Sequence, residues 1–189
     1  MKSRQIPILT FTLVVLVIAL HALVPDRTPL YFSADAIAKG ESWRVVTGHL
    51  MHADASHLLW NCLGLAVLGA LIERYSRIGL WASLGIGIMA VSALLMSPLS
   101  QLAYYCGLSG VLNTLLLVVL WLEWSRTRSW LVVAIACGSI AKAAIEVTTG
   151  HSVLTDISWP PYAWSHVAGL AGGALLIGFL NVSKLQRSS

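Results

Sequence analysis

The sequence predicts an all-α protein that crosses a membrane six times. Of its 189 residues, 57% are hydrophobic and only 11% are charged, whereas a soluble domain carries about 25% charged residues. The charges gather between six apolar runs, most of them close to the ~20 residues that a spanning helix needs. We therefore expect a single membrane domain over residues 1–189, with spans at about 8–24, 57–73, 78–96, 107–122, 130–146 and 162–181.

The first run follows Lys2 and Arg4, so a cleaved signal peptide is the alternative interpretation. The run is long for the apolar part of a signal peptide, and no small-x-small cleavage site precedes Pro25. A retained first helix is therefore favoured. The second and fifth runs are short, and they suffice if their polar ends face protein rather than lipid.

Lysine and arginine set the expected orientation, because they are enriched in cytoplasmic segments. The net charge of +4 then reflects membrane topology and does not indicate a nucleic-acid partner. Both termini are predicted to be cytoplasmic. With that topology the inner segments hold eight basic residues and the outer segments three: Lys2, Arg4, Arg74, Arg77, Arg126, Arg128, Lys184 and Arg187 against Arg27, Lys39 and Arg44.

The cysteines show no metal-binding spacing, and neither a metal nor a cofactor is expected. Cys62, Cys106 and Cys137 lie in or beside spans, where free cysteine behaves as a small apolar residue. A pairing of Cys62 with Cys106, both near outer helix ends, stays open.

Polar residues near the starts of spans two, four and six are the strongest functional signal. All three spans run from the outer to the inner face, so their starts share one depth. Polar side chains inside a membrane are costly and are candidates for function. Those at this depth are His57 and Asn61 in span two, Ser109 in span four and His166 in span six.

Each of these residues also has a purely structural explanation. His57 and Asn61 are four apart on one helical face and can make a polar contact between helices. Ser109 lies between Gly107 and Gly110 in "GLSG", and small residues allow helices to approach closely.

His166 begins a second motif of small residues. Gly169 and Gly173 follow it by three and seven positions, which forms a smooth stripe on the face that carries the histidine. If Gly110 packs on this stripe, His166 comes to lie beside Ser109.

Together the four polar residues favour acyl transfer within a membrane, and most simply peptide-bond hydrolysis. A serine hydroxyl needs an adjacent base, and His166 can be that base for Ser109. The oxyanion that forms needs fixed donors, which His57, Asn61 and the backbone N–H of Ser109 can supply. Since no acidic third residue is evident, we expect a Ser-His dyad.

The order and spacing of these motifs resemble those of the rhomboid family of intramembrane serine proteases. The resemblance runs from about Trp43 to Gly173 and implies a six-helix rhomboid-like bundle. It also implies that Ser109 is the nucleophile, His166 the base, and His57 and Asn61 the oxyanion donors. The motifs are "WR" at residues 43–44, His52-x4-His57-x3-Asn61 in "MHADASHLLWN", "GLSG" at 107–110, and His166-x2-Gly169-x3-Gly173.

By the same resemblance, His52 and Arg44 are structural residues. One position departs from the family pattern, because Asn113 stands where many bacterial rhomboids have an aromatic residue beside the catalytic histidine. Asn113 either orients His166 by a hydrogen bond or simply faces a helix; the first alternative is favoured.

The compact chain and the "GESWRVVTGHLMH…SHLLWNCLGLAVLG" pattern resemble most the rhombosortase branch. That branch implies removal of C-terminal Gly-Gly-type membrane anchors from exported bacterial proteins. The expected partners are thus the lipid bilayer and membrane-anchored substrates with a C-terminal transmembrane tail. The expected location is the bacterial inner membrane, with the active site facing the periplasm. A catalytically inactive, rhomboid-like protein that binds membrane clients is the main alternative.

Overall fold

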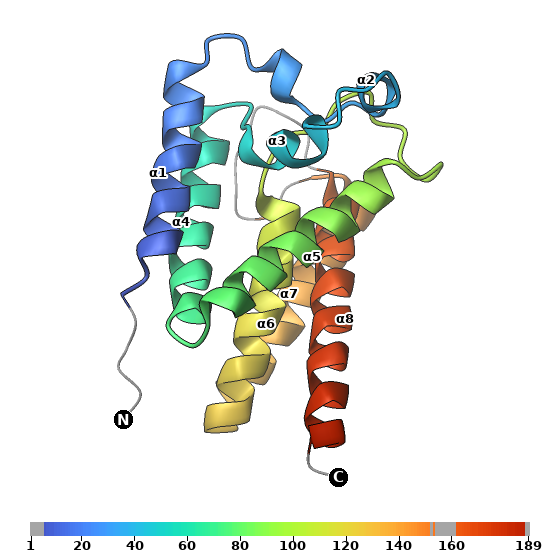
Figure 1. Cartoon of the computed structure of the whole chain (residues 1–189). Helices are drawn as coiled ribbons and strands as arrows, with labels where there is room; N and C mark the ends of the chain where they lie inside the picture. The colour runs from blue at the N-terminus through green and yellow to red at the C-terminus, as the bar shows by residue number, and fades with distance from the viewer. Residues whose placement is uncertain (1–5, 152, 154–161, 188–189) are drawn as a thin grey trace.

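The computed structural model describes residues 6–151, 153 and 162–187, with side chains as far as Asn181. Lys2, Arg4 and most of the segment that joins the last two spans lie outside these residues. Within them the only β-structure is one isolated bridge between Phe32 and Tyr105. Six long helices form the bundle in Figure 1: α1 (Ile8–Leu23), α4 (Ala55–Glu73), α5 (Arg77–Leu95), α6 (Ser109–Thr127), α7 (Trp130–Thr149) and α8 (Ala163–Arg187).

Each predicted span corresponds to one of these helices. Four segments are long and apolar enough to cross a membrane, namely α4, α5, α7 and residues Ala163–Asn181 of α8, while α1 is apolar but has only 16 residues. α6 is not among the four. It packs against α4, α5, α7 and α8, so a central helix of this kind needs less lipid-facing apolar surface.

Short polar side chains mark where the helices begin. Asp54 accepts a hydrogen bond from the backbone N–H of His57 at 2.7 Å, and Ser76 accepts one from Gly79 at 2.9 Å, which satisfies N–H groups that have no partner inside the helix. α6 and α7 are followed by the capping residues Arg128 and Gly150, both in the left-handed conformation. The helix of the fourth span begins at Ser109 rather than at the predicted residue 107, because Gly107 has φ +127°, which is incompatible with an α-helix.

The starts of α4, α6 and α8 lie at one end of the bundle, at the top of Figure 1. The same end carries the long α1–α4 connection, with the short helices η1 (Thr28–Leu30), α2 (Ala34–Ala38) and α3 (Arg44–Leu50). The first turn of α1 and the last turn of α8 lie at the opposite end. This arrangement places the starts of the three predicted site-bearing helices together.

The opposite end is held by a fully buried carboxylate. Glu73, at the end of α4, accepts hydrogen bonds from the backbone N–H groups of Leu9 at 3.0 Å and Thr10 at 2.8 Å, and from the Thr10 hydroxyl at 2.8 Å. These are first-turn N–H groups of α1, where the helix dipole favours a negative charge. Glu73 therefore fixes α1 against α4.

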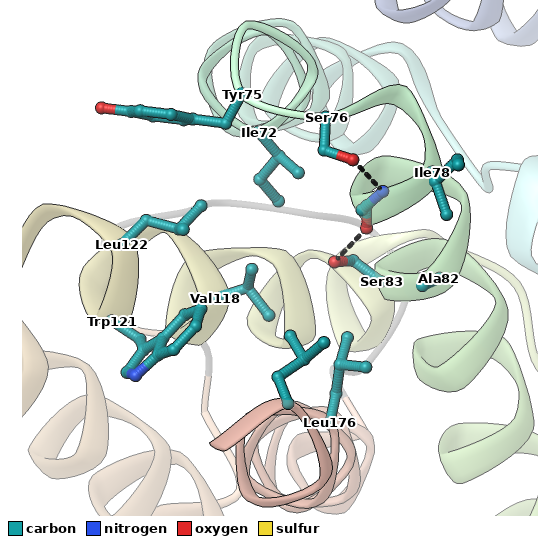
Figure 2. Close-up of a pocket in the computed structure, with 12 residues that line it drawn as sticks. Ile72, Tyr75, Ser76, Ile78, Ala82, Ser83, Val118, Trp121, Leu122 and Leu176 are labelled. Atoms are coloured by element: carbon teal, nitrogen blue, oxygen red, sulfur yellow. Dashed lines mark hydrogen bonds between the residues drawn. The ribbon is translucent and has the colours of Figure 1, made fainter. Parts of the chain in front are cut away.

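An apolar cavity of about 240 Å³ lies at the same opposite end, between the α4–α5 turn, α5, α6 and α8 (Figure 2). The hydroxyls of Ser76 and Ser83 that face it are bonded to the backbone of Gly79. Ile72 in its wall is fifteen residues from His57, or about 22 Å along the helix. The cavity is thus remote from the predicted site.

Candidate active site

The close contact of α6 with α8 is made possible by glycine. A Cβ on Gly169 would lie 1.9 Å from the carbonyl oxygen of Gly110, and one on Gly173 would lie 3.1 Å from the Cβ of Leu117. The hydroxyl of Thr114 also donates to the carbonyl of Gly169 at 2.7 Å. Gly110 therefore packs on the small-residue stripe of α8, with backbone almost touching backbone.

This contact brings Ser109 and His166 together. Ser109 is the first residue of α6, and His166 lies in the first turn of α8. The distance between Ser109 Oγ and His166 Nε2 is 3.0 Å, which is a normal hydrogen-bond length. His166 is 8% exposed, so the pair lies in a sheltered environment near the end of the bundle where α6 and α8 start.

Glu146 holds the other nitrogen of the imidazole. Its Oε2 lies 2.8 Å from His166 Nδ1, and its side chain is 1% exposed. Its second oxygen accepts hydrogen bonds from the ammonium of Lys142 and, at 3.0 Å, from the backbone N–H of Val153. The expectation that the histidine has no acidic neighbour is therefore wrong.

Two further polar side chains border the approach to Ser109. A Cβ on Gly107 would lie 2.7 Å from Nε2 of His57 and 3.8 Å from Nδ2 of Asn61, so both side chains flank this glycine. Within the part of the chain that the structure describes, Asn61 Nδ2 is buried without a hydrogen-bond partner. A buried donor without a partner is costly and is available to an incoming oxygen atom.

The strand-like segment before Ser109 is fixed by the α1–α4 connection, Pro25 to Asp54, which we call the outer connection. Phe32 and Tyr105 exchange backbone hydrogen bonds of 2.9 and 3.1 Å, and the N–H of Gly107 donates to Gly48 at 3.0 Å. The Tyr105 hydroxyl donates to the carbonyl of Gly107 at 3.0 Å. Complete burial raises the pKa of Tyr105 to about 12, so this donor stays neutral at physiological pH.

Arg44 and His52 are buried within this outer connection and make contacts that support it. Arg44 donates to the carbonyls of Thr28 and Tyr31, both at 2.9 Å, and pairs with Glu41. His52 is fully buried and stands edge-on to His57, with ring centres 5.0 Å apart. These contacts suit the structural roles expected for Arg44 and His52, which stay predictions.

Burial also keeps His49 and His52, the two histidines of the outer connection, uncharged. It lowers the pKa of His49 to about 4 and that of His52 to about 3, where the nearby His57 contributes as well. Both groups are therefore neutral at physiological pH.

Asn113 does not bond to the base. Its Nδ2 donates to the carbonyl of Ser109, one turn earlier in the same helix, at 2.9 Å. Both ring nitrogens of His166 are engaged, by Ser109 and by Glu146, so no nitrogen is left to accept from the amide. The interpretation that Asn113 orients His166 by a hydrogen bond is wrong; Asn113 bonds within its own helix.

The three cysteines are free, so the pairing left open for Cys62 and Cys106 is absent. Cys62 and Cys106 are buried as expected, whereas Cys137 is exposed on α7. Burial raises the pKa of the Cys106 thiol to about 12. The Cys106 thiol is therefore protonated at physiological pH and is a poor nucleophile.

Glu146 is the site residue that the sequence reasoning missed. α7 ends where α6 and α8 start, so a polar group at the shared depth lies near its end rather than its start. A signal for it was present, because Lys142 and Glu146 are opposite charges four residues apart within an apolar run. Such a pair indicates a buried ionised group at a defined depth.

The helices and the site agree with a comparison to known families. A family model described as the rhomboid domain matches residues 39–183, which include all the residues of the site. Rhomboid proteins are intramembrane serine proteases that act on membrane-protein substrates within the bilayer, and the apolar helices described above suit that setting. The chain belongs to the rhomboid family.

Proposed function

We propose that this protein is an active intramembrane serine endopeptidase that cleaves transmembrane segments of exported, membrane-anchored proteins. The observation that carries the proposal is the 3.0 Å contact of Ser109 Oγ with His166 Nε2. It supplies a nucleophile and its base in hydrogen-bond reach. The same contact argues against a rhomboid-like protein that only binds clients, because such a protein needs no such pair.

The proposed reaction begins when His166 Nε2 takes the proton of Ser109 while Oγ forms a bond to the carbonyl carbon of the scissile peptide. The carbonyl oxygen becomes an oxyanion, and Asn61, His57 and the backbone N–H of Ser109 donate to it. The N–H of Ser109 belongs to the first turn of α6, where backbone donors have no partner within the helix.

The intermediate collapses when the C–N bond breaks and His166 returns its proton to the leaving amine. A water molecule then gives its proton to His166 and attacks the acyl-enzyme, and Ser109 regains its proton as the acid product leaves. The substrate segment must unwind locally before attack, since the carbonyl groups inside a helix are hydrogen-bonded and shielded by side chains.

Within the family, we propose a rhombosortase-type role, the removal of C-terminal Gly-Gly-type anchors. The support is the sequence pattern of residues 40–69, "GESWRVVTGHLMHADASHLLWNCLGLAVLG". The basic residues at the end of the bundle opposite to the site favour a bacterial inner-membrane location with the site toward the periplasm. Arg74, Arg77 and Arg126 lie at that end.

Labelling with a fluorophosphonate tests the nucleophile without knowledge of the substrate. We expect the wild-type protein in mild detergent to be labelled, and Ser109→Ala and His166→Ala to lose labelling while they remain folded. Equal labelling of Ser109→Ala and wild type would exclude Ser109 as the nucleophile.

Co-expression tests the substrate class. An exported reporter with a C-terminal Gly-Gly motif, an apolar segment and basic residues is expressed with wild type or with Ser109→Ala. We expect mass spectrometry to find a shortened C-terminus only with wild type. A labelled, active enzyme that leaves this reporter intact would contradict the rhombosortase role and leave the protease role standing.

A further inference from the structure

We infer that Glu146 is the positioning residue of this site and completes a Ser-His-Glu triad within the membrane. This inference rests on the proposed protease function. The carboxylate only accepts hydrogen bonds, so its 2.8 Å contact requires the proton of the resting imidazole to be on Nδ1. Nε2 then presents its lone pair to the Ser109 hydroxyl. Glu146 thus selects the tautomer in which His166 can act as a base.

The two oxygens of this carboxylate have separate tasks. Oε1 takes the ammonium of Lys142 and the backbone N–H of Val153 at 3.0 Å, whereas Oε2 faces only His166 among the contacts of the described residues. An ionised carboxylate away from water needs such partners. Lys142 and Val153 therefore fix the group in place and leave Oε2 directed at the imidazole.

The position of Glu146 on its helix does not suit an ordinary surface ion pair. α7 is the least buried of the four candidate spans, with 11% of its apolar window buried, and its buried residues are Ala143 and Glu146. The side chain of Lys142 remains 35% exposed while that of Glu146 is 1% exposed. The carboxylate therefore points into the bundle. An ion pair with Lys142 alone could form at the surface and would not require this burial.

The charges also suit the reaction. When His166 accepts the proton of Ser109, an imidazolium forms in a region of low dielectric, where an adjacent anion is worth more than in water. Glu146 is that anion, and Lys142 balances it while the imidazole is neutral. In Ser-His-Asp enzymes, replacing this carboxylate by an amide preserves the geometry but costs about 10⁴-fold in rate, because the wrong tautomer results.

The first test compares Glu146→Gln with wild type in the rate of fluorophosphonate labelling and in cleavage of the Gly-Gly reporter. Gln has the same shape, but its NH2 group can donate to Nδ1 and leave the proton on Nε2. We expect both rates to fall at least 100-fold. The matched control is Glu73→Gln, which changes the other buried carboxylate, at the opposite end of the bundle; it should lower thermal stability without slowing labelling of the folded protein.

Nitrogen NMR of protein labelled with ¹⁵N-histidine gives a second measurement, which reads the protonation of His166 in the wild-type protein itself. His166 is assigned by its loss in His166→Gln. We expect the resting wild type to show Nδ1–H and an unprotonated Nε2 for this residue. The inference is overturned if His166 carries its proton on Nε2, or if Glu146→Gln is labelled at the wild-type rate.

These outcomes separate the two proposals. If wild type is labelled, Ser109→Ala is not, and Glu146→Gln is fully active, then Glu146 has no positioning role and the protease proposal stands. Absence of labelling in wild type removes the protease proposal, and the tautomer of His166 still reports whether Glu146 positions it.

Discussion

At the scale of single residues, the site combines groups with satisfied hydrogen bonds and two buried nitrogens, Nδ1 of His57 and Nδ2 of Asn61, that have no partner among the described residues. His166 is bonded at both nitrogens, so its orientation is fixed before any substrate arrives. Asn61 Nδ2, by contrast, is buried without a partner among the described residues. A donor kept free in this way costs stability but is ready for the charge that develops on the carbonyl oxygen.

Asn61→Ala should therefore slow catalysis, because the oxyanion loses a fixed donor. Loss of one such donor costs about 10²–10³-fold in kcat, with little change in KM, since the oxyanion exists only after binding. Asn113→Ala is the matched control. Its amide bonds to its own helix, so we expect kcat within about twofold of wild type. Cleavage of the reporter by the purified variants measures both, and equal kcat values for Asn61→Ala and wild type would contradict the oxyanion role.

The depth of a residue in the membrane could be predicted from the sequence, whereas the direction of its side chain could not. Ser109, His166, His57 and Asn61 share a depth that follows from span order alone, so the sequence places them together. The direction of a side chain depends on its neighbours instead. Asn113 turns to the carbonyl of Ser109 one turn earlier in its own helix rather than to His166, and Glu146 turns toward α8; the spacing does not decide between a neighbour on the same helix and one on another.

At the scale of helices, the α6–α8 contact is what creates the site. The two backbones meet at Gly110 and Gly169, one residue after Ser109 and three after His166. A shift of one helix against the other would therefore lengthen the Ser109–His166 contact directly.

Gly169→Ala tests this dependence. The new Cβ would lie 1.9 Å from the carbonyl oxygen of Gly110, so α8 must move away from α6. We expect at least a 100-fold loss of kcat/KM and about 1–3 kcal/mol lower stability, which is typical of overpacking. The measurements are reporter cleavage and the thermal unfolding midpoint in detergent.

Gly178→Ala, on the same helix, is the control for that variant. Apart from the backbone of its own helix, no atom of the described residues lies within 4 Å of its added Cβ, and alanine favours a helix by about 1 kcal/mol over glycine. We expect unchanged activity and unchanged or slightly higher stability. Equal activity of the two variants would show that close contact at Gly169 is not required.

At the scale of the whole molecule, the helical bundle was predictable and the outer connection was not. Long apolar runs leave few alternatives to helices in a membrane, and the ends of α1, α4 and α5 lie within about two residues of the predicted spans. The connection from Pro25 to Asp54 has no such constraint. Its form depends on contacts distant in sequence, such as those of Arg44 with Thr28 and of Gly48 with Gly107.

This outer connection makes the stability of the whole protein depend on pH. His49 and His52 lie in it, and burial lowers their pKa values to about 4 and about 3, from 6.5 in the unfolded chain. Above pH 6.5 both are neutral whether the chain is folded or not, so they confer no pH dependence. Below pH 6.5 the unfolded chain binds protons that the folded protein excludes, and the folded state loses stability until the pH falls through the folded values.

Each histidine should thus lower the free energy of unfolding by about 1.4 kcal/mol for every pH unit below 6.5, or on the order of 2 kcal/mol at pH 5. The thermal midpoint in detergent, measured from pH 7.5 to pH 5, should fall accordingly, and His52→Gln should make the slope shallower whatever its effect at pH 7.5. His151→Gln, which replaces an exposed histidine, should leave the slope unchanged. A slope that His52→Gln does not alter would show that this residue is not held neutral by burial, and the acid sensitivity would then have to arise in another part of the chain.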